Sequence, residues 1–260
     1  MESNKIDQQN IGTPWDKIYK KYQSIDLINE YIYSRLKDVL GKYIVPVDTI
    51  LEAGCGSGYM VAYFQQKGHR SVGLDNAPEP LRVAQDVFGV KNVVLGDLFK
   101  MPFANSSFDI VWNEGVLEHF PFKEALKGVK EMRRVAKKYV IIDVPNRYSP
   151  FVIKKHLMRF ARRWQYGFEE SYSSKRLRSL MERAGLRVIG EHGIYGAMPF
   201  TVWDKRNILP LLFLTIPLPS FLLKRLLDKL FLFEKRYPKF VRMFGFHLLM
   251  VGEVVPEAQR

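Results

Sequence analysis

Three glycines at alternate positions form the chemically most distinctive feature of the sequence. Gly54, Gly56 and Gly58 follow a short apolar run that ends with Ile50, Leu51 and then Glu52. Because glycine has no Cβ, a turn built from it can adopt positive φ angles and bring peptide N–H groups against a ligand. A helix that begins near Ser57 would direct its positive end to the same place. The pattern predicts a strand, a tight turn and the start of a helix, an arrangement that dinucleotide enzymes, kinases and plain tight turns all use.

Two acids occupy the ends of the next two apolar segments. Asp75 closes the segment that begins at Arg70, and Asp97 lies in the segment 93–98. In an open α/β sheet, an acid at the tip of the second strand holds the two hydroxyls of a ribose. The glycine spacing is G-x-G-x-G rather than G-x-G-x-x-G, which argues against NAD as the ligand.

Four motifs, in this order, resemble those of the class I S-adenosylmethionine (SAM) dependent methyltransferases. They are L-E-A-G-C-G-S-G from Leu51, V-G-L-D from Val72, V-V-L-G-D-L from Val93 and S-F-D-I-V-W from Ser107. The resemblance covers about residues 44–193 and is greatest to the small-molecule branch that includes the quinone-biosynthesis enzymes. It implies SAM as cofactor and a small-molecule or lipid-like acceptor for methylation at oxygen, carbon or nitrogen.

The resemblance also implies a role for each cofactor-binding residue. The glycine turn would bind the carboxylate of the methionine part, with Glu52 ordering the turn, and Asp75 would bind the ribose diol. Asp97 would read the adenine together with the Leu98 backbone, and Asn113 would contact the amino end of the methionine part. The predicted cofactor-binding residues are Glu52, Gly54, Gly56, Gly58, Asp75, Asn76, Asp97, Leu98 and Asn113.

Methyl transfer is an in-line displacement, so placement of the acceptor can supply much of the acceleration. An acceptor that is a hydroxyl or an ammonium also needs a base to take its proton. His119 is the candidate because it comes soon after the fourth strand and has an ordinary pKa near 6.5. A lone histidine can instead serve as a helix cap or a packing residue. Glu118, His156 and Tyr148 are lesser candidates.

The order of apolar and polar segments predicts the elements that position these residues. Strands alternate with helices, which is typical of a parallel, doubly wound sheet whose ligands bind beyond the carboxyl ends of the strands. The expected fold is α/β, a seven-stranded Rossmann-like methyltransferase sheet with an antiparallel edge strand, N-terminal helices and a helical insertion before the last strand. The expected strands are 48–52, 71–74, 92–95, 108–112, 139–144, 186–191 and 245–254, and the main helices are 57–67, 78–88, 121–135 and 174–184.

The chain divides into four expected regions. Residues 1–43 would form an N-terminal tail and helices, in which Trp15, Tyr19 or Tyr22 either cover the cofactor or simply pack on the sheet. Residues 44–198 would form the SAM-binding core, 199–244 a hydrophobic and basic helical insertion, and 245–260 the last strand and a tail.

The insertion combines apolar residues at helical spacing with cations between them. Residues 222, 223, 226, 227 and 230 are apolar, as in a helix that lies at a membrane interface. Three prolines and the short apolar length argue against a bilayer-spanning helix. Contact with a membrane surface through 205–240 and packing as a cap on the sheet or a partner subunit both remain open.

Composition narrows the functional classes further. The 260 residues carry a net charge of +13, concentrated in the second half, which would attract phosphates or an anionic membrane face or would only make a soluble surface basic. The single cysteine, Cys55, excludes an intramolecular disulfide, and the polar first residues lack the apolar core of a signal peptide. We therefore expect a cytoplasmic protein. The basic charge and the insertion leave association with a membrane surface open.

Metal and nucleic-acid functions find little support in the motifs. The sequence shows no zinc-binding pattern, and we predict no metal site. The fourth strand ends in N-E-G-V, unlike the N/D-P-P-Y/F of base amino methylases, so nucleic acid is an unlikely partner. An RNA methyltransferase and a non-catalytic SAM-fold protein at a membrane or partner surface remain the alternatives. The acceptor and the oligomeric state are not determined by the sequence.

Overall fold

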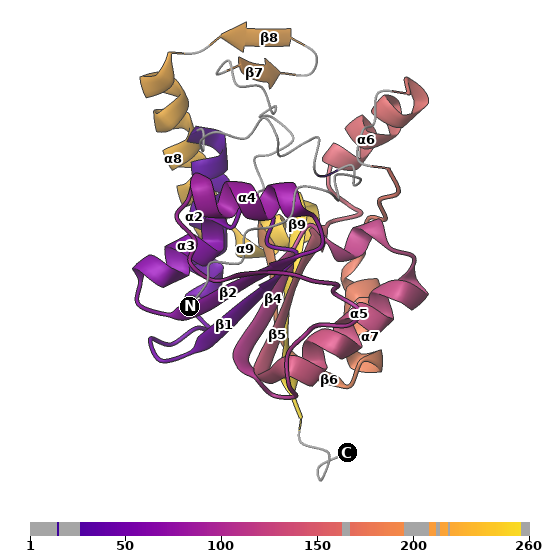
Figure 1. The fold of residues 1–260 in the computed structure, drawn as a ribbon. Coiled ribbons are helices and arrows are strands. Elements are labelled where there is room, and N and C mark those ends of the chain that lie inside the picture. Colours follow the sequence, from indigo (N-terminus) through magenta and orange to yellow (C-terminus); the bar gives the residue numbers. More distant parts are fainter. Residues whose placement is uncertain are drawn as a thin grey trace.

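A seven-stranded sheet forms the centre of the computed structural model, which describes Trp15 and residues 27–162, 167–194, 208–211, 214–217 and 219–255. The sheet order is β3-β2-β1-β4-β5-β9-β6 (Figure 1). The strands are β1 (Thr49–Ala53), β2 (Arg70–Asp75), β3 (Val93–Leu95), β4 (Phe108–Glu114), β5 (Ala136–Pro145), β6 (Leu186–Ile194) and β9 (His247–Val254). The predicted fold class is confirmed.

Strand direction places the predicted site. Strands β1 to β5 run parallel, whereas β9 pairs antiparallel with both β5 and the outermost strand β6. The antiparallel strand predicted for this side of the sheet is therefore β9, which lies one place in from the edge. The strand order reverses between β1 and β4, and at such a point an open parallel sheet leaves a crevice for ligands.

Helices cover both faces of the sheet because the strands are apolar on both sides. Along β4, Ile110 and Trp112 belong to one buried cluster with α2 (Leu27–Leu40), α3 (Tyr59–Gln66) and α8 (Ser220–Arg236). The side chain of Val111 points to the other face of the sheet, where it belongs to a second buried cluster with α5 (Phe122–Val135) and α7 (Ser174–Arg183). Figure 1 shows the two helical layers on either side of the strands. Helix α4 (Pro78–Asp86) packs beside α3.

Some boundaries differ from the sequence-based expectation. Helix α3 begins at Tyr59 rather than near Ser57, because Gly58 has a left-handed φ of 68° and the helix can start only after it. Strand β4 continues to Glu114, so Asn113 and Glu114 lie within the strand and not beyond it. The basic connection after β5 contains the helix α6 (Phe151–Phe160). Tyr19 and Tyr22 lie outside the described residues.

The insertion before the last strand is only partly helical. A two-stranded hairpin, β7 (Ile208–Leu211) with β8 (Leu214–Pro217), precedes α8, and the short α9 (Pro238–Phe244) follows it. Helix α8 buries Leu227 and Glu234 against α2, where the Arg35 guanidinium donates to the Glu234 carboxylate at 2.7 Å. Among the described residues, no helix is both long and apolar enough to span a membrane.

Candidate functional site

A cavity of about 360 Å³ lies beyond the carboxyl ends of β1, β2 and β4. Several predicted site residues that are remote in sequence meet in its wall. They are Gly54, Gly56, Asp75, Asn76, Asp97, Leu98 and His119. Trp15, proposed from the sequence as a cover, lines the cavity as well. The convergence expected from the strand ends is therefore present in the fold.

The glycine turn forms one wall of the cavity and depends on the absence of side chains. Gly54, Gly56 and Gly58 all have positive φ angles, of 83°, 50° and 68°. A Cβ added to Gly54 would lie 2.4 Å from the Val116 Cγ2 atom, far inside van der Waals contact. The Gly54 N–H donates to the Leu74 carbonyl at 2.6 Å, which joins the turn to β2. The turn is thus packed closely against the loop that follows β4.

Asp75 connects the glycine turn to the start of α4. Its Oδ2 accepts a hydrogen bond from the Gly56 N–H at 2.9 Å, and its Oδ1 accepts one from the Ala77 N–H at 3.0 Å. An ionised carboxylate has about four lone-pair sites, so both oxygens can accept further hydroxyl donors from the cavity. These bonds fix the carboxylate in the position expected for a ribose ligand.

Asp97 and a group of apolar and aromatic side chains line another side of the cavity. The Asp97 Oδ1 atom accepts a hydrogen bond from the Phe99 N–H at 2.9 Å, which shapes the loop after β3. Phe99 and Phe120 pack edge to face with their ring centroids 4.9 Å apart, and the Leu98 side chain is buried beside them. An apolar, aromatic wall with a carboxylate beside it suits a planar heteroaromatic ring.

Three predicted cofactor ligands do not line the cavity. Gly58 caps α3, whereas Glu52 and Asn113 are buried side chains in β1 and β4. The Glu52 Oε2 atom and both amide atoms of Asn113 make no hydrogen bond within the described part of the chain. Burial raises the pKa of Glu52 well above its ordinary value, and the nearby Glu114 and Asp75 carboxyls raise it further. The roles given to these residues remain predictions.

His119 faces the cavity from the short 3-10 helix η1 (Leu117–His119). Its Nδ1 atom lies 2.9 Å from the Phe168 carbonyl oxygen, and its ring packs edge to face against Trp15 with the centroids 5.0 Å apart. Because a carbonyl only accepts hydrogen bonds, this contact places the ring hydrogen on Nδ1 in the neutral imidazole. Nε2 is then the nitrogen able to take up a proton.

The lesser base candidates lie elsewhere. Glu118 is fully buried, and burial raises its pKa well above the ordinary value, with the Glu169, Asp143 and Glu114 carboxyls adding to the effect. A carboxyl that keeps its proton cannot act as a base. His156 and Tyr148 are exposed and do not line the cavity. Among the four sequence candidates, only His119 reaches the cavity wall.

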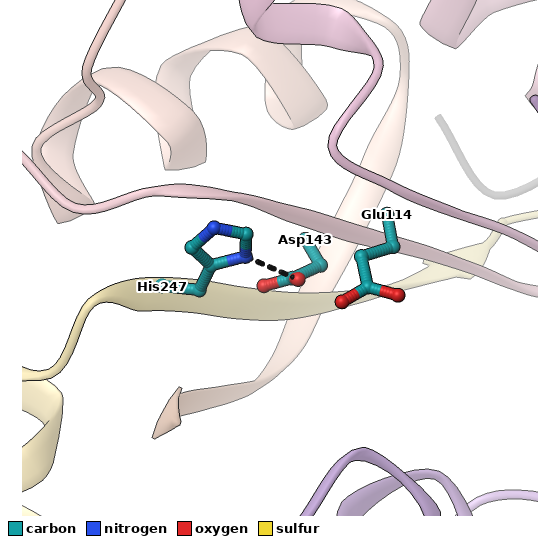
Figure 2. A group of neighbouring side chains, drawn as sticks. All are labelled: Glu114, Asp143 and His247. Atoms are coloured by element: carbon teal, nitrogen blue, oxygen red, sulfur yellow. Dashed lines mark hydrogen bonds and ion pairs between the residues drawn. The ribbon is translucent and has the colours of Figure 1, made fainter. Parts of the chain in front are cut away.

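A group of three ionisable residues, of which Asp143 and His247 are buried and Glu114 is half-buried, adjoins the cavity and was not predicted as a site. Glu114 on β4, Asp143 on β5 and His247 on β9 point toward one another (Figure 2), and one ligand atom from each lies within 4.8 Å of the other two. Glu114 also lines the cavity. The sequence signal was a polar residue in each of three apolar strands, but only strand register brings the three together.

Burial determines the protonation of this group. The His247 Nδ1 atom lies 2.7 Å from the Asp143 Oδ2 atom. Desolvation raises the pKa of Asp143 well above its ordinary value and lowers that of His247 to about 4. The uncharged pair, in which the carboxylic acid donates to Nδ1, is therefore favoured. Deprotonated, the three residues form an oxygen and nitrogen donor set that could hold a divalent cation.

Comparison with known proteins adds a family match. Residues 51–142 match the family model described as "Methyltransferase domain". A malonyl-[acyl-carrier protein] O-methyltransferase from Serratia marcescens is 25% identical over 113 residues, which is 44% of this chain and 44% of that protein. The chain spans about half the length of the curated relatives it matches.

Solved structures match over nearly the whole chain. One is from the complex of the Haloferax volcanii Trm112 methyltransferase activator with a methyltransferase, at 20% identity and a TM-score of 0.64, covering 94% of this chain and 95% of that one. Another is the magnesium protoporphyrin IX methyltransferase of Synechocystis with bound S-adenosylhomocysteine, at 13% identity and a TM-score of 0.56, covering 93% of each chain. At these identities the likeness establishes a shared fold.

Proposed function

The chain carries a class I SAM-dependent methyltransferase domain, and from that premise we propose that it transfers a methyl group from SAM to a small-molecule or lipid-like acceptor. S-adenosylhomocysteine would be the second product. The observation that carries the proposal is the meeting of the glycine turn, Asp75, Asp97 and His119 around one cavity.

The residues present fit SAM in three respects. The turn at Gly54 leaves no room for a Cβ, so its backbone can approach a ligand closely. The Asp75 carboxylate is held by two backbone N–H groups and would accept the two ribose hydroxyls. Asp97 lines the same side of the cavity as the packed rings of Phe99 and Phe120, and the adenine would lie against this side.

The catalytic contribution of the chain would be placement and proton removal. SAM, when bound, supplies a methyl group that its sulfonium makes electrophilic. Alignment of an acceptor with that methyl can contribute about 7–11 kcal/mol to the lowering of the barrier. His119, with Nδ1 fixed by the Phe168 carbonyl, would take the proton of a hydroxyl or ammonium acceptor on Nε2.

The nature of the acceptor is supported by the cavity wall and by relatives. Val116, Phe99 and Phe120 give the cavity an apolar side, which suits a small or lipid-like molecule. The names of two proteins reported above state that they methylate malonyl-[acyl-carrier protein] and magnesium protoporphyrin IX. Neither name identifies the acceptor of this chain.

The test is incubation of the purified protein with methyl-labelled SAM and an extract of its own host. We expect label in molecules below protein size or in the lipid extract, and none with the Asp75→Ala variant. Label in nuclease-sensitive material would favour the RNA alternative. A complete absence of transfer, with SAM bound, would favour the non-catalytic alternative and contradict the proposal.

The base role of His119 has a separate test. The His119→Gln variant should bind SAM as the wild type does but lose about 10²–10⁴-fold in kcat on a hydroxyl acceptor, because proton removal is lost. Part of that loss should be recovered at higher pH, where hydroxide can replace the imidazole. An unchanged kcat would remove His119 from the mechanism.

A further inference from the structure

The outer side of α8 and α9 exposes an unusual amount of apolar surface. Six large side chains there are between 41% and 68% exposed: Phe221, Leu232, Phe233, Tyr237, Phe240 and Met243. Three of them form a contiguous cluster, because the ring centroid of Phe233 lies 4.9 Å from that of Tyr237 and 5.9 Å from that of Phe240. Contiguous exposed apolar patches are rare on soluble proteins and mark sites of interaction.

The orientation of this surface is fixed by buried contacts on the opposite side of α8. Leu227 is buried against the sheet cluster, and Glu234 is buried in its ion pair with Arg35 of α2. With 3.6 residues per turn, positions 221, 225, 229, 232 and 236 lie on the side of the helix away from these anchors. Phe221 and Leu232 are therefore held outward by the fold, together with the cations Arg225, Lys229 and Arg236.

Positive charge is interleaved with the apolar side chains. Arg225, Lys229, Arg236, Lys239 and Arg242 are all exposed on the two helices. Asp228 is the only exposed acid among the described residues of α8 and α9. Such a surface attracts a partner of high negative charge density, and its apolar side chains can then contact the apolar part of that partner.

The composition distinguishes a lipid surface from a protein partner. Protein interfaces are enriched in Arg but depleted in Lys, whereas interfacial helices carry both Lys and Arg beside Phe and Leu. The exposed lysines of α8 and α9, which include Lys224, Lys229 and Lys239, therefore favour a lipid surface. We propose that this aromatic and basic face, formed by α8 and α9, docks on the surface of an anionic lipid membrane. The aromatic rings and leucines would enter the headgroup boundary, and the cations would contact lipid phosphates.

Helix α8 extends to the same end of the molecule as the cavity. Figure 1 shows α8 rising toward the end of the molecule opposite the C-terminus. Because β9 is antiparallel to β5, that end is where the parallel strands finish and where the cavity lies. The proposal does not depend on methyl transfer, since it concerns binding of the protein to lipid.

The test is co-sedimentation of the whole protein with vesicles. One set would contain phosphatidylcholine alone, and the other would contain phosphatidylglycerol as about a third of the lipid. We expect binding to the anionic vesicles that weakens with salt. The Arg225→Glu/Lys229→Glu variant should bind at least about tenfold more weakly, since each cation near the surface contributes about fivefold and each is reversed.

Matched controls separate docking from misfolding and from general charge. Lys123→Glu/Lys130→Glu makes the same charge change on exposed residues of α5, across the sheet, and should bind vesicles as the wild type does. Phe233→Ser/Phe240→Ser should lose vesicle binding while keeping the SAM affinity of the wild type in calorimetry.

Four results would overturn the proposal. They are a lack of binding to anionic vesicles, equal binding by the two charge-reversal variants, retained binding by the double Phe variant, and a dimer in sedimentation velocity that the double Phe variant abolishes. The last result would assign the face to a second copy of the chain. None of them bears on SAM binding, so failure here and failure of the proposed function are distinguishable.

Discussion

The glycine turn gives the sharpest test of the site geometry through the variant Gly54→Ala. An alanine there must adopt a φ of 83°, which costs about 1–2 kcal/mol for an L-residue. Its Cβ would also lie 2.4 Å from Val116 Cγ2, and overpacking of this kind costs about 1–3 kcal/mol. We therefore expect Gly54→Ala to lower the free energy of unfolding by about 2–5 kcal/mol.

A matched variant isolates the two contributions. Gly68 has a φ of 88°, but a Cβ there would have no neighbour within 4 Å, so Gly68→Ala should cost only the backbone strain of about 1–2 kcal/mol. In the double variant Gly54→Ala/Val116→Ala the clash is removed, because the contacting atoms are the Val116 methyls. A double-mutant cycle should then show about 1–3 kcal/mol of favourable coupling.

Urea unfolding and SAM calorimetry together measure this prediction. Gly54→Ala should weaken SAM binding because the turn must shift away from Val116, whereas Gly68→Ala should leave SAM binding unchanged. The reasoning is refuted if Gly54→Ala lowers the free energy of unfolding by no more than Gly68→Ala does. It is also refuted if Gly54→Ala is as destabilising in the Val116→Ala protein as in the wild type.

Two further predictions concern buried charges. Arg35→Met should destabilise the protein by about 3–5 kcal/mol in urea unfolding, because it removes the cation that lies 2.7 Å from the buried Glu234 carboxylate. Arg35→Met/Glu234→Leu should recover most of that loss, and a double variant as unstable as the single one would contradict this. The His247 pKa is lowered to about 4, so between about pH 6.5 and 4 the unfolded chain takes up a proton that the folded chain does not. Stability present above pH 6.5 is therefore lost on acidification, by up to about 3 kcal/mol relative to His247→Gln, and parallel pH profiles of unfolding for the two proteins would disprove it.

The sequence predicted those parts of the site that local chemistry determines. Asp75 ends a strand, and the glycine turn and Asp97 come just after one; the carboxyl ends of parallel strands necessarily meet at one edge of the sheet. The resemblance to the class I methyltransferases and the doubly wound fold are both confirmed. The individual roles of the cofactor ligands and of His119 stay predictions.

The parts that could not be predicted depend on contacts between distant segments. Asp143 and His247 are 104 residues apart, and their contact follows from the register of β9 on β5. The Phe168 carbonyl that orients His119 belongs to a connection with no regular pattern. The hairpin of β7 and β8 was not predicted, and the insertion was expected to be helical. The prolines in these two segments interrupt the alternation by which strands are recognised.

The central claim is that Asp75 and the glycine turn bind SAM, and calorimetric titration of the protein with SAM tests it most directly. The account predicts one SAM per chain, with Asp75→Ala at least about a hundredfold weaker, since two hydrogen bonds to a charged acceptor contribute about 1.5–3 kcal/mol each. Asp86→Ala, an exposed acid at the end of α4, is the control and should bind as the wild type does. Unchanged affinity in a folded Asp75→Ala protein would contradict the claim.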